Sequence, residues 1–171
     1  MFKKILLWCA LISCMSLIFY FSSQEATESQ NTSSRFIKTI VKIVDFKNTF
    51  SDEKVAEIAE KLSVLVRKIA HFSIYALLGL IFALLISQYK IYGTRQFLFA
   101  LIFCFLYACS DEIHQLFVPG RSGEIKDVLL DTFGGAFGIG ITKIILIRRD
   151  RKWHILKNTT NGLITKNLTT I

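Results

Sequence analysis

Most of the side chains that could do chemistry in this sequence stand where long apolar runs begin or end. Ionisable groups at membrane depth are costly, and they usually face a wet cavity or the interior of a helix bundle, where they pair. We therefore expect three helix ends to bring these groups together, either as a site or as a network that pins the helices. The groups are Arg67, Lys68 and His71 at one helix end, Asp111, Glu112, His114 and Gln115 at the second, and Arg121, Asp127 and Asp131 at the third.

Two of these residues are candidates for proton transfer. Glu112 could act as a general acid or base if burial raises its pKa, and His71 could serve in the same role. The competing interpretation is that Glu112 is a structural partner of Arg121. The sequence leaves both open.

Arg121 is the candidate for anion binding. It lies in the turn Pro119-Gly120-Arg121-Ser122-Gly123, and its planar guanidinium group matches phosphate or carboxylate. Backbone donors ahead of the following helix would add to such a site. The alternative is that Arg121 only pairs with Glu112 or Asp127. Asp127 and Asp131 are four residues apart and share one face of a helix.

Metal binding has less support in the sequence. His71 and His114, with Asp111 or Glu112, could ligate a metal because imidazole and carboxylate are suitable ligands. No familiar ligand spacing such as HExxH is present, so we expect no metal and no other cofactor. The cysteines also lack ligand spacing and lie inside apolar runs, so we expect buried, unreactive thiols at Cys9, Cys14, Cys104 and Cys109.

The chain is apolar enough for a membrane protein. Its hydrophobic fraction of 52% and mean hydropathy of +0.46 exceed what soluble domains usually carry. A membrane-spanning helix takes about 20 mostly apolar residues. The sequence therefore predicts an all-α fold, a polytopic membrane helical bundle of about four transmembrane helices, at residues 5–21, 70–87, 96–110 and 128–147.

The first apolar run allows two interpretations. It follows Lys3 and Lys4, and Leu11-Ile12-Ser13-Cys14 resembles a lipoprotein cleavage box, so the run could be a processed signal. The run nevertheless stays apolar through Phe21, where a processed signal would normally turn polar. We therefore expect residues 1–21 to be a retained transmembrane anchor.

We expect residues 22–66 to form an outer polar loop that contains amphipathic helices. Residues 22–34 look turn-like or disordered. Residues 35–46 place their apolar positions on one stripe, which predicts a helix that lies in the membrane interface or packs on the bundle. Ser51, followed by Asp52 and Glu53, predicts a helix start that runs on into the second span.

The last span contains Gly134 and Gly138 at the spacing of a GxxxG motif. Small residues let helix backbones approach closely in a membrane, so this face predicts a seam between packed helices.

Lysine and arginine near the span ends predict the orientation, because cytoplasmic loops carry an excess of them. With both termini inside, residues 22–66 and 111–126 lie outside, and residues 148–171 form a basic cytoplasmic tail. The net charge of +8 then reflects topology, and we expect no nucleic-acid partner. The inner residues would be Lys3, Lys4, Lys90, Arg95, Arg148, Arg149, Arg151 and Lys152.

Two blocks of the sequence resemble the VanZ-like family of bacterial membrane proteins. The first is Arg67-Lys68-Ile69-Ala70-His71-Phe72, with Tyr75 and Leu78 after it, and the second is Ser110-Asp111-Glu112-Ile113-His114-Gln115-Leu116-Phe117-Val118-Pro119-Gly120-Arg121. The resemblance runs over residues 67–147, a core of three spans, and does not draw on the first span or the long loop. Asp131 stands where many relatives have asparagine. The family pattern maps onto Lys68, His71, Glu112, Gln115, Arg121 and Asp127.

The resemblance implies a protein of the bacterial cytoplasmic membrane with a link to glycopeptide resistance, since the family's namesake lowers susceptibility to teicoplanin. It implies no reaction. The first function that we consider is that of a membrane factor that modifies the response of the cell envelope to glycopeptides. Its partners would be membrane lipids and a cell-wall precursor or glycopeptide-related target. The alternatives are an enzyme that acts on a lipid-linked, phosphate-bearing precursor and, least favoured, a small transporter, because an inverted repeat is missing.

Overall fold

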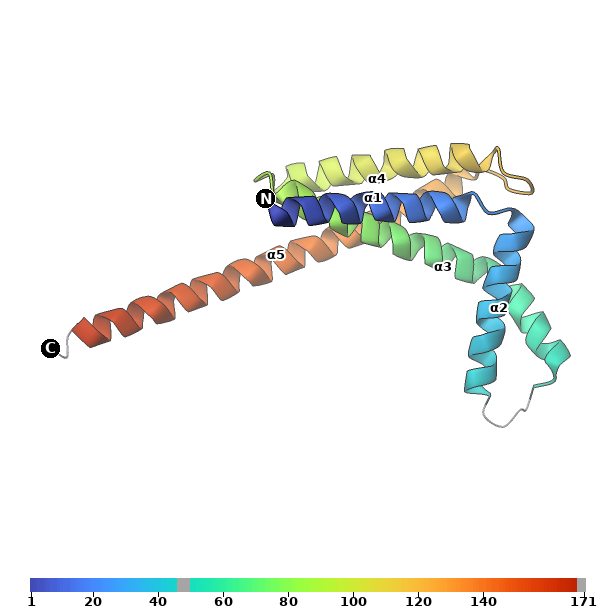
Figure 1. The fold of residues 1–171 in the computed structure, drawn as a ribbon, viewed down its shortest axis with the longest axis horizontal. Coiled ribbons are helices and arrows are strands. Elements are labelled where there is room, and N and C mark those ends of the chain that lie inside the picture. Colours follow the sequence, from blue (N-terminus) through green and yellow to red (C-terminus); the bar gives the residue numbers. More distant parts are fainter. Residues whose placement is uncertain (46–49, 169–171) are drawn as a thin grey trace.

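The computed structural model describes residues 1–45 and 50–168, with only the backbone described for Asp150 and from residue 152 onward. Within these residues the chain is all-α, as predicted. Four of the helices run along a common axis, and α2 lies across one end of them (Figure 1). The helices are α1 (Phe2–Ser22), α2 (Ala26–Val44), α3 (Asp52–Ser87), α4 (Gly93–Gln115) and α5 (Ile125–Leu168).

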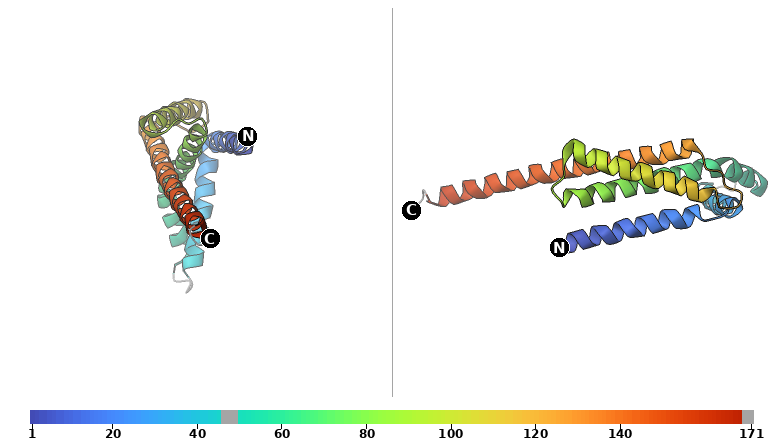
Figure 2. Two further views of the ribbon diagram at one scale, coloured as in Figure 1. Left: turned by 90° about the vertical axis from the view of Figure 1, so that its left-hand side faces the viewer. Right: turned by 90° about the horizontal axis from the view of Figure 1, so that it is seen from above.

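Four helices are long enough and apolar enough to cross a membrane: Phe2–Ser22, Asp52–Ser87, Gly93–Gln115 and Ile125–Arg149. Their outward faces expose large apolar side chains such as Leu106 and Phe133, which is the surface expected where lipid is the solvent. The predicted membrane bundle is therefore confirmed. Figure 2 shows α1, α3, α4 and α5 extending side by side along the bundle.

The third span extends beyond Ser110. The sequence predicted a span over residues 96–110 that is short unless residues up to Leu116 are added, and α4 continues to Gln115. Its last turn is helical although it is acidic, because Asp111, Glu112 and Gln115 are buried against the other helices. The helix of the fourth span continues beyond the span, which ends at Arg149: the backbone of the predicted tail is helical to Leu168, and residues 169–171 lie outside the described residues.

The centre of the bundle is α3, which contacts every other helix, and α5 is its main partner. The GxxxG glycines of α5 make this contact possible. A Cβ atom on Gly134 would overlap the carbonyl oxygen of Phe72, and one on Gly138 would overlap that of Ala76, both on α3. The predicted packing seam is confirmed, and its partner is the middle of α3.

The segment predicted to be turn-like is instead the first half of α2. Ser29, Ser33 and Ile37 recur every fourth residue and are buried, and α2 packs against α3. A stripe of small side chains lets two helices come close, and this packing outweighs the modest helix propensity of serine and threonine. The facing part of α3 is equally regular, with Val55, Ala59 and Ser63 buried.

The predicted apolar stripe of α2 is divided between two environments. Ile37 is buried, whereas Phe36, Ile40 and Val44 are exposed. The helix therefore packs on the bundle and still presents an apolar edge. The predicted packing on the bundle is confirmed, and the position of α2 in the membrane interface stays a prediction.

The predicted start of α3 is confirmed. The Ser51 side chain accepts a hydrogen bond from the backbone N–H of Lys54, and Asp52 and Glu53 occupy the first turn. From there the helix is unbroken to Ser87, so the polar segment and the second span form one rod.

The first helix contributes to the core. Leu11, Cys14 and Ile18 are buried in the same cluster as Tyr75 and Cys104. The hydroxyl of Tyr107 on α4 donates a hydrogen bond to the carbonyl oxygen of Met15, at 2.7 Å. All four cysteines are free. Cys14 and Cys104 are buried as expected, whereas Cys109 is only partly buried and Cys9 is exposed on α1, so the prediction was wrong for Cys9.

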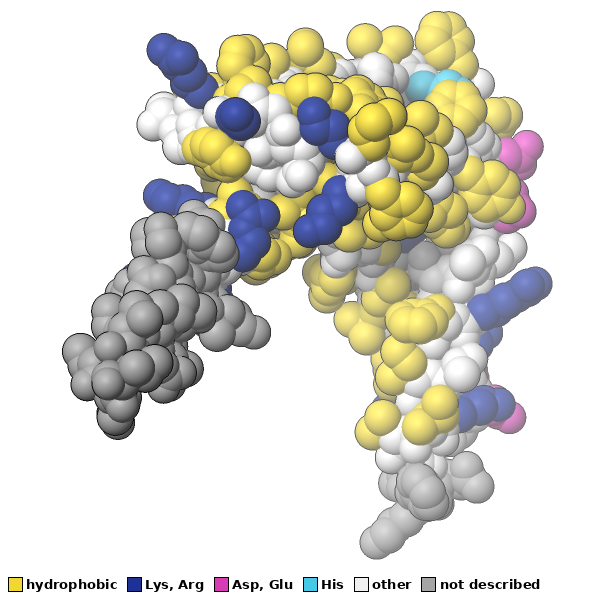
Figure 3. Space-filling view, turned by 60° about the vertical axis from the view of Figure 1, so that its left-hand side comes forward, with side chains coloured by type: hydrophobic (Ala, Val, Ile, Leu, Met, Phe, Trp, Pro, Cys, Tyr) yellow, Lys and Arg dark blue, Asp and Glu magenta, His cyan; other side chains and the backbone are white. Residues whose placement is uncertain are grey.

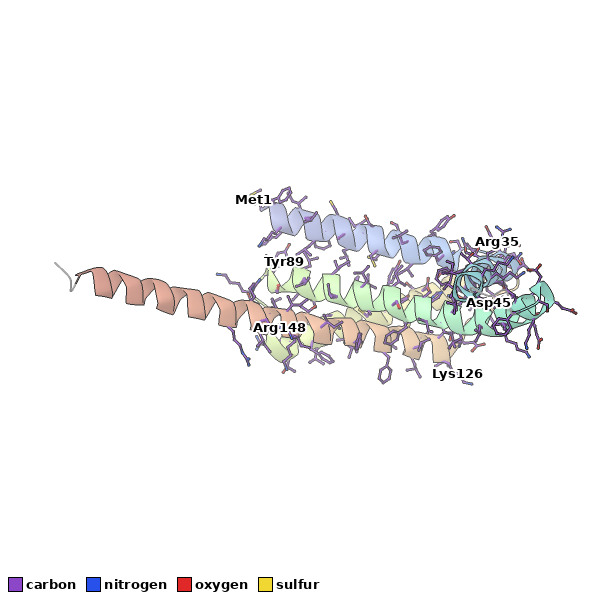
Figure 4. The ribbon with its side chains drawn as sticks, turned by 90° about the horizontal axis from the view of Figure 1, so that it is seen from below. Met1, Arg35, Asp45, Tyr89, Lys126 and Arg148 are labelled. Atoms are coloured by element: carbon purple, nitrogen blue, oxygen red, sulfur yellow. The ribbon has the colours of Figure 1, made fainter. Side chains whose placement is uncertain are left out.

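The two ends of the bundle differ in their charged side chains: lysine and arginine gather at one end, whereas the other carries acidic residues together with basic ones. Met1, Tyr89 and Arg148 lie toward one end, and Arg35, Asp45 and Lys126 lie toward the other (Figure 4). Lysine and arginine side chains surround the first end, where the C-terminal part of α5 leaves the bundle (Figure 3). The second end holds the connections Ser23–Glu25 and Leu116–Glu124, and we call it the cavity end.

Candidate functional site

A cavity of about 350 Å³ opens at the cavity end of the bundle. It receives side chains from α2, α3, α4 and α5 and from the turn between α4 and α5. All seven predicted site residues line it, so the structure brings together what the sequence distributes over 64 positions between Lys68 and Asp131. The lining residues are Ala26, Gln30, Val64, Arg67, Lys68, His71, Glu112, Gln115, Gly120, Arg121, Ser122, Glu124, Asp127, Leu130 and Asp131.

Lys68 and Asp127 form an ion pair across the cavity wall. The Lys68 Nζ atom lies 2.5 Å from Asp127 Oδ1, which links α3 to the first turn of α5. Both side chains are partly exposed, so solvent screens the pair and its contribution to stability is modest. The pair removes one anionic charge from the cavity.

Arg121 is held by backbone carbonyl groups and an amide. Its Nε donates to the carbonyl oxygen of Gln24 at 3.1 Å, its Nη2 to that of Phe21 at 3.3 Å, and its Nη1 to Gln115 Oε1 at 3.4 Å. The predicted alternative, a pairing with Glu112 or Asp127, is not what the structure shows. Arg121 instead binds the last carbonyl groups of α1 and the connection after it.

The turn that presents Arg121 has the expected shape. Gly120 has a φ of +74°, a conformation that costs glycine nothing and other residues more. Burial lowers the pKa of the Arg121 guanidinium, and the nearby cation of Arg67 adds to that effect, while Asp111 and Glu112 oppose it. Arginine starts from so high a pKa that it stays charged.

Both carboxylate oxygens of Glu112 accept hydrogen bonds. Oε2 accepts from the backbone N–H of Glu124 at 2.8 Å, and Oε1 accepts from Gln115 Nε2 at 3.2 Å. Glu124 directly precedes α5, where backbone N–H groups lack helical partners. Glu112 therefore fixes the start of α5, which is the structural role weighed for it, although with a different partner from Arg121. Its role in proton transfer stays a prediction.

Asp111 ties α4 to α1 below the cavity. Its Oδ2 accepts a hydrogen bond from Ser22 Oγ at 2.8 Å, and both side chains are buried. Gln115 Nε2 makes a longer contact of 3.4 Å to the same oxygen. Ser22 was missed by sequence reasoning, and the signal for it was a serine at the point where the first apolar run ends.

The least satisfied polar groups lie at the floor of the cavity. His71 Nδ1 is 3.7 Å from Asp131 Oδ2, which is an ion-pair distance but too long for a hydrogen bond. Asp131 is 1% exposed, and neither of its oxygens has a hydrogen-bond partner, nor does the buried hydroxyl of Tyr75. Buried polar groups are nearly always paired, so this cluster calls for an explanation.

A metal could be held only by part of the predicted set. Ligand atoms of His71, Asp111 and Asp131 lie within 4.8 Å of one another. His114 does not join them: its ring stacks on Phe19 at 4.4 Å, and its Nε2 lies 3.0 Å from Ser23 Oγ. His71 and His114, the two imidazoles considered as possible ligands of one metal, therefore do not meet at this cluster.

Arg67 is the residue whose part in the site was underrated. The sequence placed it at the entry of the second span but not among the binding residues. It lines the cavity, its Nε is buried without a hydrogen-bond partner, and among the described residues it forms no ion pair. It is thus a cation in the cavity that remains available to a ligand.

The fold and the site define a polytopic, all-α membrane protein with a polar cavity at one end of its helix bundle. The sequence model of the VanZ/LLP1 family matches residues 7–147, and the chain belongs to this family. The match begins in α1, so the expected resemblance over residues 67–147 was too narrow. The comparison with curated proteins found no match, and neither did the comparison with solved structures.

Proposed function

We propose that this protein lies in the bacterial cytoplasmic membrane and binds the phosphate group of a lipid-linked envelope precursor in its cavity. Through that binding it alters the response of the cell to glycopeptide antibiotics such as teicoplanin. The observation that carries the proposal is Arg67, a cavity cation with a buried and unpartnered Nε. A phosphate oxygen is the acceptor that a guanidinium group fits best.

Two of the acidic side chains around Arg67 are already engaged, which leaves its positive charge to attract an anion, although Asp131 and Glu124 line the same cavity. Lys68 neutralises Asp127, and Glu112 is occupied by the backbone N–H of Glu124. Arg121 lines the same cavity and uses three of its donors on oxygen atoms, which leaves about two of the five that the group offers. Arg67 and Arg121 therefore present N–H groups from two walls.

The surroundings of the cavity favour a ligand that carries a lipid chain. Val64 lines the cavity and is about half exposed. Leu116, Phe117 and Ile125 stand near it in the sequence of the turn and are all more than half exposed. A ligand held by its phosphate here could leave its hydrocarbon chain against this apolar surface.

The charge asymmetry supports a cavity on the outer side. Because cytoplasmic loops carry the excess of lysine and arginine, the end with Lys3, Lys4, Lys90 and Arg148 faces the cytoplasm in our proposal. Both termini are then cytoplasmic, and the cavity end faces the compartment in which glycopeptides act.

The proposal is tested in a susceptible Gram-positive host. We expect the wild-type protein to raise tolerance to teicoplanin, and Arg67→Gln to remove that gain at an equal membrane level. Arg35→Gln is the matched control, because Arg35 is exposed on α2 and does not line the cavity. Tolerance that stays unchanged with well-inserted wild-type protein, or that Arg67→Gln leaves intact, contradicts the proposal.

Direct binding gives a second measurement. With the purified protein and a polyprenyl phosphate, we expect Arg67→Gln to weaken binding by about 10- to 100-fold, the value of one charge-assisted hydrogen bond. The same lipid without its phosphate should bind at least as weakly to the wild type. Equal affinity for the two lipids would mean that the cavity does not recognise phosphate.

An enzyme acting on such a precursor is the second candidate. The pair of His71 and Asp131 favours it, because a carboxylate beside an imidazole is an arrangement used to orient a general base. Release of phosphate or of the headgroup by the purified protein, abolished by His71→Gln, would support an enzyme. Tight binding without turnover would support the binding function only.

A further inference from the structure

We propose that His71, Asp111 and Asp131 form a binding site for one divalent transition-metal cation, such as Zn²⁺ or Mn²⁺, at the floor of the cavity. One ligand atom from each residue lies within 4.8 Å of the others. The three side chains come from α3, α4 and α5, so the site exists only when these helices are packed together. This site is independent of the phosphate proposal.

The distances between the ligand atoms need only small side-chain movements to accommodate a metal ion. Ligand atoms about 2.0 to 2.2 Å from a tetrahedral metal lie roughly 3.5 Å from one another. His71 Nδ1 and Asp131 Oδ2 are already 3.7 Å apart. That separation is too long for a hydrogen bond but close to the spacing of two ligands of one ion.

The burial of Asp131 without a hydrogen-bond partner also points to a ligand. It is 1% exposed, and both of its oxygens are buried without a hydrogen-bond partner. A carboxylate left so inside a membrane bundle is strongly unfavourable unless something pairs with it, and His71, at 3.7 Å, pairs with it only when the imidazole is protonated. A cation between Asp131, Asp111 and His71 would satisfy the group without any new protein contact.

Asp111 is already oriented for such a role. Ser22 Oγ and Gln115 Nε2 both donate to its Oδ2, which leaves Oδ1 available to a metal. Hydrogen bonds that orient a ligating carboxylate are typical of metal sites. The Ser22 contact in particular gives α1 a part in the site.

Of the basic side chains that line the same cavity, Lys68 and Arg121 are engaged elsewhere, whereas Arg67 is not paired and opposes a cation. Two carboxylates and a neutral imidazole carry two negative charges, which one divalent cation balances. Lys68 is engaged by Asp127, and Arg121 donates to Phe21, Gln24 and Gln115. The mix of nitrogen and oxygen ligands favours Zn²⁺ or Mn²⁺ over Ca²⁺ and Mg²⁺, which prefer oxygen alone.

The site would be reachable from the cavity. His71 and Asp131 both line it, so water or a ligand atom can complete the coordination of the ion. Three protein ligands and an open position are the composition of reactive metal sites in contrast to closed structural ones.

The test uses the purified full-length protein, stripped with chelator, and titrated with Zn²⁺, Mn²⁺ or the spectroscopic probe Co²⁺. We expect one ion per chain by elemental analysis, with a rise in Tm. Asp131→Asn and His71→Gln should each weaken binding by at least about 100-fold. His114→Gln is the matched control, because it removes an imidazole at the same end that stacks on Phe19.

A further variant tests the orientation of Asp111. Ser22→Ala should weaken metal binding by about 10- to 100-fold, the usual effect of removing such a hydrogen bond. Near-isosteric Asp111→Asn serves if Asp131→Asn does not fold. Folded wild type that binds no ion at about 100 µM metal overturns the proposal, and so does binding that Asp131→Asn and His71→Gln leave unchanged.

Discussion

At the scale of residues, the cavity separates groups that hold the structure from groups that remain available. Glu112 and Arg121 form hydrogen bonds with backbone groups of neighbouring segments. Arg67 and Asp131, in contrast, have buried polar atoms without hydrogen-bond partners. The sequence suggested a different division, with Glu112 as a leading candidate for chemistry. Unsatisfied buried groups are better markers of a binding function than paired ones, because pairing already accounts for the presence of the residue.

Substitution of Glu112 distinguishes its two roles. Glu112→Ala should destabilise the protein by about 1–3 kcal/mol, because the partly buried contact with the N–H of Glu124 is lost and the amide of Gln115 loses its acceptor. Glu112→Gln should cost less, because an amide oxygen can still accept from Glu124. The measurement is thermal unfolding in detergent. If Glu112→Gln abolished function without lowering Tm, a role in proton transfer would be supported instead.

At the scale of elements, the parts that the sequence predicted well are those with strong local signals. The apolar runs, the Ser51 cap and the GxxxG seam are all confirmed. The helix at residues 26–34 was missed because its polar composition is decided by packing: Ser29 and Ser33 are buried only once α3 lies beside them. His114 lies against Phe19 and does not line the cavity, because it is one residue from Gln115, which places it about 100° around α4.

The seam between α3 and α5 gives a prediction with an internal control. Gly138→Ala should lower stability by about 1–3 kcal/mol, since the added methyl group meets the backbone of Ala76 and two rigid helices must separate. Gly140→Ala on the same helix should be neutral or stabilising, because nothing lies within 4 Å of its Cβ position. Folded yield and Tm measure both. Equal effects of the two variants would contradict the assigned seam.

The first helix gives a prediction about processing. We expect the mature protein to retain it, because Leu11, Cys14 and Ile18 fill the core and Ser22 binds Asp111. Cleavage before Cys14 would remove Leu11 and expose the part of the core that it covers. The intact mass of protein purified from membranes checks this prediction. A product that begins at Cys14 and carries lipid would show that the resemblance to a lipoprotein box is the true signal.

At the scale of the whole molecule, the fold could be predicted further than the site. Hydropathy alone indicates the spans and places seven distant residues at one end of the bundle, because each lies near a span terminus. Hydropathy does not show which side chains face one another. The unpartnered Arg67 and Asp131, and the contact between Ser22 and Asp111, depend on the rotation of each helix about its axis, which only the packed structure supplies.

The hydrogen bonds between Arg121 and the end of α1 have a consequence for which residues of this site can change during evolution. It binds the carbonyl oxygens of Phe21 and Gln24, and every amino acid offers such an oxygen. Side chains at those two positions can therefore change without disturbing the bond, while the arginine must stay. We expect the side chains at these two positions to vary among relatives that keep the arginine, and a comparison of their sequences would not reveal this contact between the turn and α1.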